Sequence, residues 1–223
     1  MDYGNMFSLL KKSFLHEWKL YTEHAFVKKL SNNTLLIESF LDYLVQDYLF
    51  LIQFSKAWSL AIVKAENLEE MKLCSNTVNG LINFEIDLHI KLCQKYGISA
   101  DILNSASEKN KNIAYTRYVL ESGYSGDFLD LIATLIPCVI GYAEIGTNLK
   151  NSNPSNTMYQ TWIQTYSGKE YQNISKQVGI LFDKAVETRL GKNFQKTYKW
   201  KRILTKFKTA TLLEIDFWEM ALE

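Results

Sequence analysis

Apolar residues recur at intervals of three and four positions through most of the 223-residue sequence. Residues spaced in this way lie on one face of a helix, so the pattern predicts amphipathic α-helices. No segment alternates apolar and polar residues over more than a few positions, and the chain has only 2 prolines and 10 glycines to form turns. A fold of many strands needs more turn residues. The sequence therefore predicts an all-α protein, a single-domain bundle of long antiparallel helices over residues 1–223.

Capping residues and glycines mark the ends of the expected helices. Asn67 begins a long helix that ends at Gly97, and Asp127 caps an apolar helix that ends near Gly146. Other helical stretches are expected to include residues 7–21, 36–51, 107–123, 159–166, 168–191 and 204–220. The clearest loop covers residues 152–155.

The composition and the cysteine count exclude several classes of protein. Hydrophobic residues make up 47% of the chain and charged residues 22%, which excludes intrinsic disorder. A net charge of +1 argues against a dedicated nucleic-acid binder. The three cysteines show no Cys-x-x-Cys spacing, and the N-terminus does not resemble a signal peptide, so we expect a cytoplasmic protein without disulfides.

The longest apolar stretch runs from residue 131 to 143 and contains Pro137. It is shorter than the ~18–20 residues that a membrane span needs, so we expect a buried core helix and no membrane partner. A proline inside a helix removes one backbone donor, which predicts a kink at this position.

Cys138 follows that proline directly. It is either a small buried hydrophobic residue or a nucleophile on a kinked helix beside a cavity. The three histidines have no context that marks a general base, so carboxylates and tyrosines are the expected partners of the thiol. Asp47 and Glu214 each interrupt an apolar helix. Each is either an exposed charge on an amphipathic helix, or a buried carboxylate that pairs, meets a ligand, or acts as a general acid through a raised pKa.

Two other patterns have both a functional and a structural interpretation. One helix face would carry Glu85, His89 and Cys93, and this spacing could form part of a metal site. Helical di-iron sites need about six ligands, however, so a hydrogen-bonded structural histidine is favoured. Residues 192–208 contain seven basic and no acidic residues, with four aromatic residues among them. They form either an RNA-binding patch or a solvated helix face, and the near-neutral net charge favours the second.

Five segments, in the same order and over nearly the whole chain, resemble the TenA family of thiaminase II or aminopyrimidine aminohydrolases. They are residues 43–51, 114–118, 135–138 with Tyr142 and Glu144, 162–167, and 214–221. The resemblance implies a haem-oxygenase-like helical bundle, a homotetramer, and no metal, haem or other cofactor. It also implies a small-molecule partner, and hydrolysis at the exocyclic methylene of a 4-amino-2-methylpyrimidine. The expected substrates are 4-amino-5-aminomethyl-2-methylpyrimidine and thiamine.

The resemblance also implies a role for each matching residue. Cys138 would be the nucleophile that adds to the ring, and Glu214 would protonate the ring nitrogen. Asp47 would accept a hydrogen bond from the 4-amino group. Tyr142 and Tyr166 would contact the substrate. Tyr115 would help hold the thiol, and Phe217 would help form the wall of the pocket.

Phe50 departs from the family pattern, because many members have a tyrosine there that is thought to help activate the thiol. The phenylalanine keeps the aromatic surface and loses the hydroxyl, so we expect slower thiol activation. Two other classes of function stay open. One is a non-catalytic pyrimidine-binding or regulatory protein on the same fold, and the other is a metal-dependent oxidase that uses Glu85 and His89.

Overall fold

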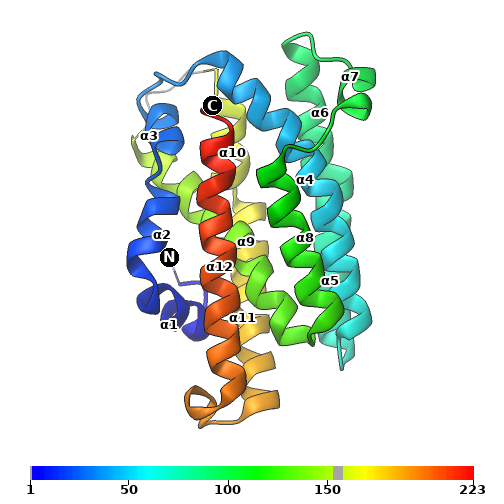
Figure 1. The fold of residues 1–223 in the computed structure, drawn as a ribbon, viewed down its shortest axis with the longest axis vertical. Coiled ribbons are helices and arrows are strands. Elements are labelled where there is room, and N and C mark those ends of the chain that lie inside the picture. The colour runs from blue at the N-terminus through cyan, green and yellow to red at the C-terminus, as the bar shows by residue number, and fades with distance from the viewer. Residues whose placement is uncertain (1, 153–157) are drawn as a thin grey trace. The chain divides into compact units, whose positions relative to one another are not determined.

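A computed structural model describes residues 2–152 and 158–223. These residues form helices and turns and contain no β-strand, which confirms the predicted all-α class (Figure 1). The elements are α1 (Asn5–Ser13), α2 (Leu15–Thr22), α3 (Ala25–Ser31), α4 (Ile37–Lys64), α5 (Leu68–Gly80), the π-helical turn η1 (Leu81–Glu85), α6 (Ile86–Lys95), α7 (Ala100–Ser105), α8 (Asn110–Ser125), α9 (Phe128–Ser152), α10 (Gln160–Ser167), α11 (Lys169–Leu190), the 3₁₀ turn η2 (Phe194–Lys196) and α12 (Tyr198–Met220).

The chain divides into two compact units. The first unit contains Met1–Leu35 and Ile132–Ile215, and the second contains Leu36–Leu131 and Asp216–Glu223. Helices α9 and α12 therefore each contribute residues to both units. The single domain over residues 1–223 stays a prediction.

In the first unit, α11 packs against α1 and α10. Gly179 on α11 allows the close approach of the segment before α1, because a Cβ atom there would lie 1.7 Å from the carbonyl oxygen of Tyr3. Trp18 from α2 stacks on Phe207 from α12, with ring centroids 5.7 Å apart and 13° between the planes. Aromatic packing of this kind holds the short N-terminal helices onto the long ones.

The central part of α9 is buried, as the sequence predicts. Every residue from 131 to 143 is buried. One segment, Phe128–Asn151, is long and apolar enough to cross a membrane, but 94% of its most apolar window is buried inside the protein. The segment is thus the predicted core helix.

In the second unit, α4 packs against α5, α6 and α8 (Figure 1). This central position explains why α4 carries apolar residues on more than one face. The Asn67 side chain accepts a hydrogen bond from the amide of Glu70 at 3.0 Å, so it caps α5 as predicted. Asp127 and Asp130 cap α9 reciprocally, each accepting at 3.1 Å from the backbone amide of the other.

Several helix limits differ from the predictions. The helix predicted from Asn67 to Gly97 is continuous but contains the η1 turn, and α9 continues past Gly146 to Ser152. Gly146 serves close packing instead of ending the helix, because a Cβ there would lie 2.6 Å from the Tyr166 backbone. The predicted stretch 7–21 folds as two short helices, α1 and α2, and helices α3 and α7 lie outside the predicted stretches. Residues 153–155 of the predicted loop lie outside the described residues.

Candidate functional site

The eight predicted site residues are all buried and fall into two groups, one in each unit. The first unit contains Cys138, Tyr142, Tyr166 and Glu214, and the second contains Asp47, Phe50, Tyr115 and Phe217.

The group in the first unit is built around α9. Cys138 and Tyr142 lie one turn apart on that helix, so they share one face. The Tyr142 ring lies 4.9 Å from the Tyr166 ring, and Tyr166 lies 4.6 Å from Trp162, both measured between centroids. Tyr142, one turn after Cys138 on the same face of α9, therefore belongs to an aromatic cluster formed by α9 and α10.

The three free cysteines differ in their surroundings. Cys138 is 7% exposed, whereas Cys74 and Cys93 are fully enclosed. Burial, with a smaller effect of the Glu70 charge, raises the pKa of Cys74 to about 12. Burial alone raises the pKa of Cys93 to about 11. These two thiols stay protonated near neutral pH and are poor nucleophiles, because the thiolate is the reactive form.

Glu214 and Asp47 are both buried, with exposed fractions of 1% and 2%. This excludes the interpretation of either residue as an exposed charge on an amphipathic helix. A buried carboxylate is unfavourable unless it is paired, hydrogen-bonded or protonated. The remaining interpretation of both residues is that of a buried carboxylate that pairs, meets a ligand or acts as a general acid, and their roles in a site stay a prediction.

The partners of Asp47 are known in detail. Its Oδ2 atom accepts a hydrogen bond from the Tyr43 hydroxyl at 2.9 Å and lies 2.7 Å from Nε2 of His89. The other ring nitrogen of His89, Nδ1, lies 2.9 Å from the Glu85 carbonyl oxygen. The sequence favoured a hydrogen-bonded structural histidine at this position, and the contact with the Glu85 carbonyl agrees with that interpretation, but the pairing of His89 with Asp47 was not predicted. The two residues are 42 positions apart, and nothing in the helical periodicity indicates that their helices bring them together.

Burial lowers the pKa of His89, but the charge and hydrogen bond of Asp47 and the Glu85 carbonyl outweigh it and raise the pKa overall. The ring is fully enclosed and faces an acceptor at each nitrogen. A buried imidazolium paired with a carboxylate fits these surroundings.

The metal interpretation of this helix face gains no support. Within the described ranges 2–152 and 158–223, no cluster of three or more histidine, cysteine or acidic side chains could hold a metal ion. The ring nitrogens of His89 lie 2.7 Å from an Asp47 oxygen and 2.9 Å from a backbone carbonyl oxygen instead.

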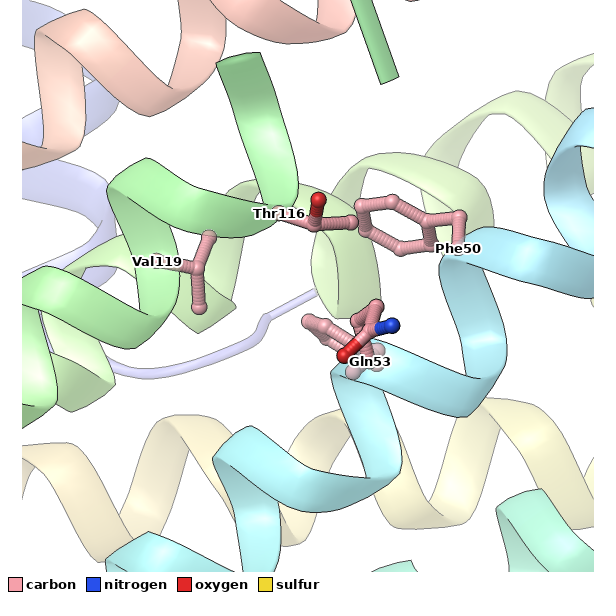
Figure 2. Close-up of a pocket in the computed structure, with 5 residues that line it drawn as sticks. Phe50, Gln53, Thr116 and Val119 are labelled. Atoms are coloured by element: carbon pink, nitrogen blue, oxygen red, sulfur yellow. The ribbon is translucent and has the colours of Figure 1, made fainter. Parts of the chain in front are cut away.

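The second group also contains an aromatic cluster. The ring centroid of Phe50 lies 5.0 Å from that of Tyr115, 5.4 Å from that of Phe217 and 5.2 Å from that of Phe54. Phe50 also borders a narrow recess between α4 and α8, which Figure 2 shows. The recess is lined by Phe50, Gln53, Phe54, Thr116 and Val119. It has no room for a water molecule, so it is a gap in the packing and not a substrate pocket.

The basic segment 192–208 is unsuited to stacking nucleic-acid bases. Three of its four aromatic side chains, Phe194, Trp200 and Phe207, are buried. Only Tyr198 among the four is exposed, and Lys208 pairs with Glu17 at 3.0 Å. Base stacking requires exposed rings, so this segment is better explained as the outer face of a packed helix.

Comparison with known proteins places the chain in a family. It matches the TENA/THI-4/PQQC family model over residues 12–223. An aminopyrimidine aminohydrolase from Halalkalibacterium halodurans is 31% identical over 206 residues, which cover 92% of this chain and 89% of that protein. A crystal structure described as a TenA family transcription regulator from a Silicibacter species is 50% identical, with a TM-score of 0.96 over 99% of this chain and 97% of that one.

A more distant structure shows the fold alone. A domain of unknown function with a heme oxygenase-like fold, from Shewanella denitrificans, superposes with a TM-score of 0.74 at 10% identity. The alignment covers 99% of this chain and 93% of that domain. The predicted haem-oxygenase-like architecture is thereby confirmed, and the chain belongs to the TENA/THI-4/PQQC family.

Proposed function

We propose that this protein is an aminopyrimidine aminohydrolase, or thiaminase II, of thiamine salvage and degradation. It hydrolyses 4-amino-5-aminomethyl-2-methylpyrimidine to 4-amino-5-hydroxymethyl-2-methylpyrimidine and ammonia. It also cleaves thiamine to the same hydroxymethylpyrimidine and a thiazole. The observation that carries the proposal is the similarity, over nine-tenths of the chain, to a protein named for this activity. The burial of Cys138, Asp47 and Glu214 supports it.

The proposed chemistry begins with Cys138. Its sulfur adds to the pyrimidine ring while Glu214 donates a proton to a ring nitrogen, which gives a neutral, dearomatised adduct. The amine, in its protonated ammonium form, leaves the exocyclic methylene as ammonia, and the thiazolium of thiamine leaves as a neutral thiazole, each with the electron pair of its bond. Water adds to the methylene and loses a proton. Expulsion of the Cys138 sulfur as a thiolate, with return of the ring-nitrogen proton to Glu214, restores the aromatic ring. Addition of the thiol thus replaces a difficult direct displacement by an elimination followed by an addition.

The other site residues bind the substrate in this proposal. Asp47 accepts a hydrogen bond from the 4-amino group, and a carboxylate strengthens such a bond because it is charged. Tyr142 and Tyr166 contact the substrate from their shared cluster. Tyr115 supplies a hydroxyl near the thiol. The rings of Phe50 and Phe217 form an apolar wall, and their contact at 5.4 Å supports this role.

A second function is favoured by one specific observation. The 50% identical protein from Silicibacter is described as a transcription regulator, and Phe50 lacks the hydroxyl that many TenA members carry. A chain that binds an aminopyrimidine without turning it over would serve as a sensor or regulator. Calorimetric binding of the hydroxymethylpyrimidine, together with no release of ammonia from the aminomethylpyrimidine, would favour this function.

Release of ammonia from the aminomethylpyrimidine tests the leading proposal. Wild-type protein should release ammonia, and Cys138→Ser should lose at least about a thousandfold in rate, because a serine hydroxyl stays protonated and is a far weaker nucleophile. Cys93→Ala is the matched control, since it removes another buried thiol and should keep the wild-type rate. Equal rates for the wild type and Cys138→Ser would refute the covalent mechanism.

The proposal includes a homotetramer that works in the cytoplasm. Light scattering coupled to size-exclusion chromatography tests the tetramer, and fractionation of cells that express the tagged chain tests the location.

A further inference from the structure

The pair formed by Asp47 and His89 has a geometry that bears on substrate recognition. We propose that His89 is a positioning residue, which fixes the orientation of the Asp47 carboxylate so that Oδ1 is presented to the exocyclic amino group of the aminopyrimidine. This inference rests on the function proposed above. It adds a residue that does not itself contact the substrate.

The two contacts of His89 determine its protonation state. A neutral imidazole has one N–H group and one acceptor nitrogen. Here Nδ1 lies 2.9 Å from a carbonyl oxygen and Nε2 lies 2.7 Å from a carboxylate oxygen, so each nitrogen faces an acceptor. The short contact with the carboxylate and the carbonyl oxygen at the other nitrogen together favour the doubly protonated imidazolium. The contact at Nε2 is a close ion pair and not an aligned hydrogen bond.

The contacts with Tyr43 and His89 also determine the orientation of the Asp47 carboxylate. Both the Tyr43 hydroxyl and His89 Nε2 approach the same oxygen, Oδ2. The hydrogen bond from Tyr43 and the ion-pair contact with His89, which come from two helices, hold the plane of the carboxylate in place. Oδ1 is then the oxygen that can receive a donor from a ligand. Because a hydrogen bond from an amino group is directional, the orientation of the carboxylate contributes to recognition.

The backbone before His89 supplies an independent observation. Leu81–Glu85 forms a π-helical turn, in which the amide of Ile86 donates to the Leu81 carbonyl five residues earlier. Such turns are rare and often occur at functional sites, because the additional residue redirects the side chains that follow. His89 lies one turn after this segment and contacts the carbonyl of its last residue, Glu85. The π-helical turn thus sets the direction in which His89 points.

The groups that surround His89 come from two elements. Tyr43 and Asp47 belong to α4, with the Tyr43 ring 6.5 Å from the imidazole between centroids. Glu85 belongs to η1, and its carbonyl and charge both favour the imidazolium. A buried ion pair carries no net charge, which reduces the cost of its burial.

A comparison of two ligands tests the inference. Calorimetry would measure binding of 4-amino-5-hydroxymethyl-2-methylpyrimidine and of the analogue that lacks the 4-amino group. The wild type should prefer the amino compound by about 10- to 100-fold, the range for hydrogen bonds to a charged group. His89→Leu should reduce this preference to about threefold or less, and His89→Gln should recover part of it, because the amide can still donate to Oδ2. Cys93→Ala, one turn further along α6, should keep the full preference.

The outcomes separate this inference from the proposed function. A wild type that does not prefer the amino compound and releases no ammonia would refute the function itself. A wild type that prefers it, with His89→Leu folded and equally selective, would refute only the role of His89. Nitrogen NMR of the wild-type imidazole at pH 7.5 tests the same point without any substitution. Two protonated ring nitrogens are expected, and a neutral ring would overturn the inference even if the variants fail to fold.

Discussion

The aromatic ring of Phe50 lies 5.0 Å from the ring of Tyr115, between centroids, with 38° between the two planes. The two residues come from α4 and α8, and both are buried. The contact shows that a phenylalanine keeps the aromatic packing at a position where many TenA members have a tyrosine. What the chain lacks there is one hydroxyl.

Restoring that hydroxyl should increase activity. A hydrogen bond from the hydroxyl to the thiolate favours the reactive form of the thiol, so Phe50→Tyr should increase kcat/KM about tenfold. Ammonia release at pH 7 measures the change. Phe54→Tyr is the matched control, because it places the same group one turn away on α4 and should give no gain. Equal rates for Phe50→Tyr and the wild type would show that this hydroxyl does not limit the reaction.

Alkylation should distinguish the three cysteines. Burial raises the pKa of Cys74 to about 12 and of Cys93 to about 11, so neither forms much thiolate at pH 8. Iodoacetamide should therefore modify Cys138 first, and activity should disappear at the rate of this modification. Peptide mass spectrometry identifies the site. Full modification of Cys93 while the enzyme stays active would contradict both the burial of this thiol and the assignment of the nucleophile.

Stability should decrease at alkaline pH. The folded protein keeps the protons on Cys74 and Cys93, whereas the unfolded chain releases them above their ordinary pKa of 9.0. Each thiol then lowers the free energy of unfolding by about 1.4 kcal/mol at pH 10. Urea unfolding at pH 8 and pH 10 measures the difference. The double variant Cys74→Ala with Cys93→Ala should show a smaller decrease, and an unchanged decrease would contradict this explanation.

Gly141 should not accept a side chain. A Cβ atom there would lie 2.2 Å from Cε1 of the Tyr21 ring, so Gly141→Ala forces the ring to move. Overpacking of this kind costs about 1–3 kcal/mol of stability. The same substitution in a Tyr21→Leu background should cost less, because a smaller side chain leaves room. Denaturant unfolding of the four proteins tests this, and an equal cost in both backgrounds would place the strain elsewhere.

Local signals in the sequence were sufficient for much of the fold. Gly168 and Gly191 flank α11 as predicted, and Gly191 has φ of 68°, a conformation that a glycine adopts without strain. Asn67 and Asp127 cap the predicted helices through their own side chains. These signals act within a few residues of the chain, and this is why a single sequence reveals them.

Features that depend on contacts between distant segments were not predictable in this way. The sequence singled out Asp47 because it interrupts an apolar helix, but gave no sign that His89 is its partner. Gly146 appeared to end α9, whereas its role is to admit the Tyr166 backbone. Nothing in the 3.6-residue periodicity distinguishes a glycine that ends a helix from one that lets another segment approach.

The π-helical turn at Leu81–Glu85 has a consequence for how related chains are compared. Each residue of an α-helix advances the side-chain direction by about 100°, so loss of one residue from this turn would rotate the following helix by that amount and direct residue 89 away from Asp47. The length of this short segment therefore carries information that the identity of its residues does not. An alignment that closes a one-residue gap here would match histidines that face different directions.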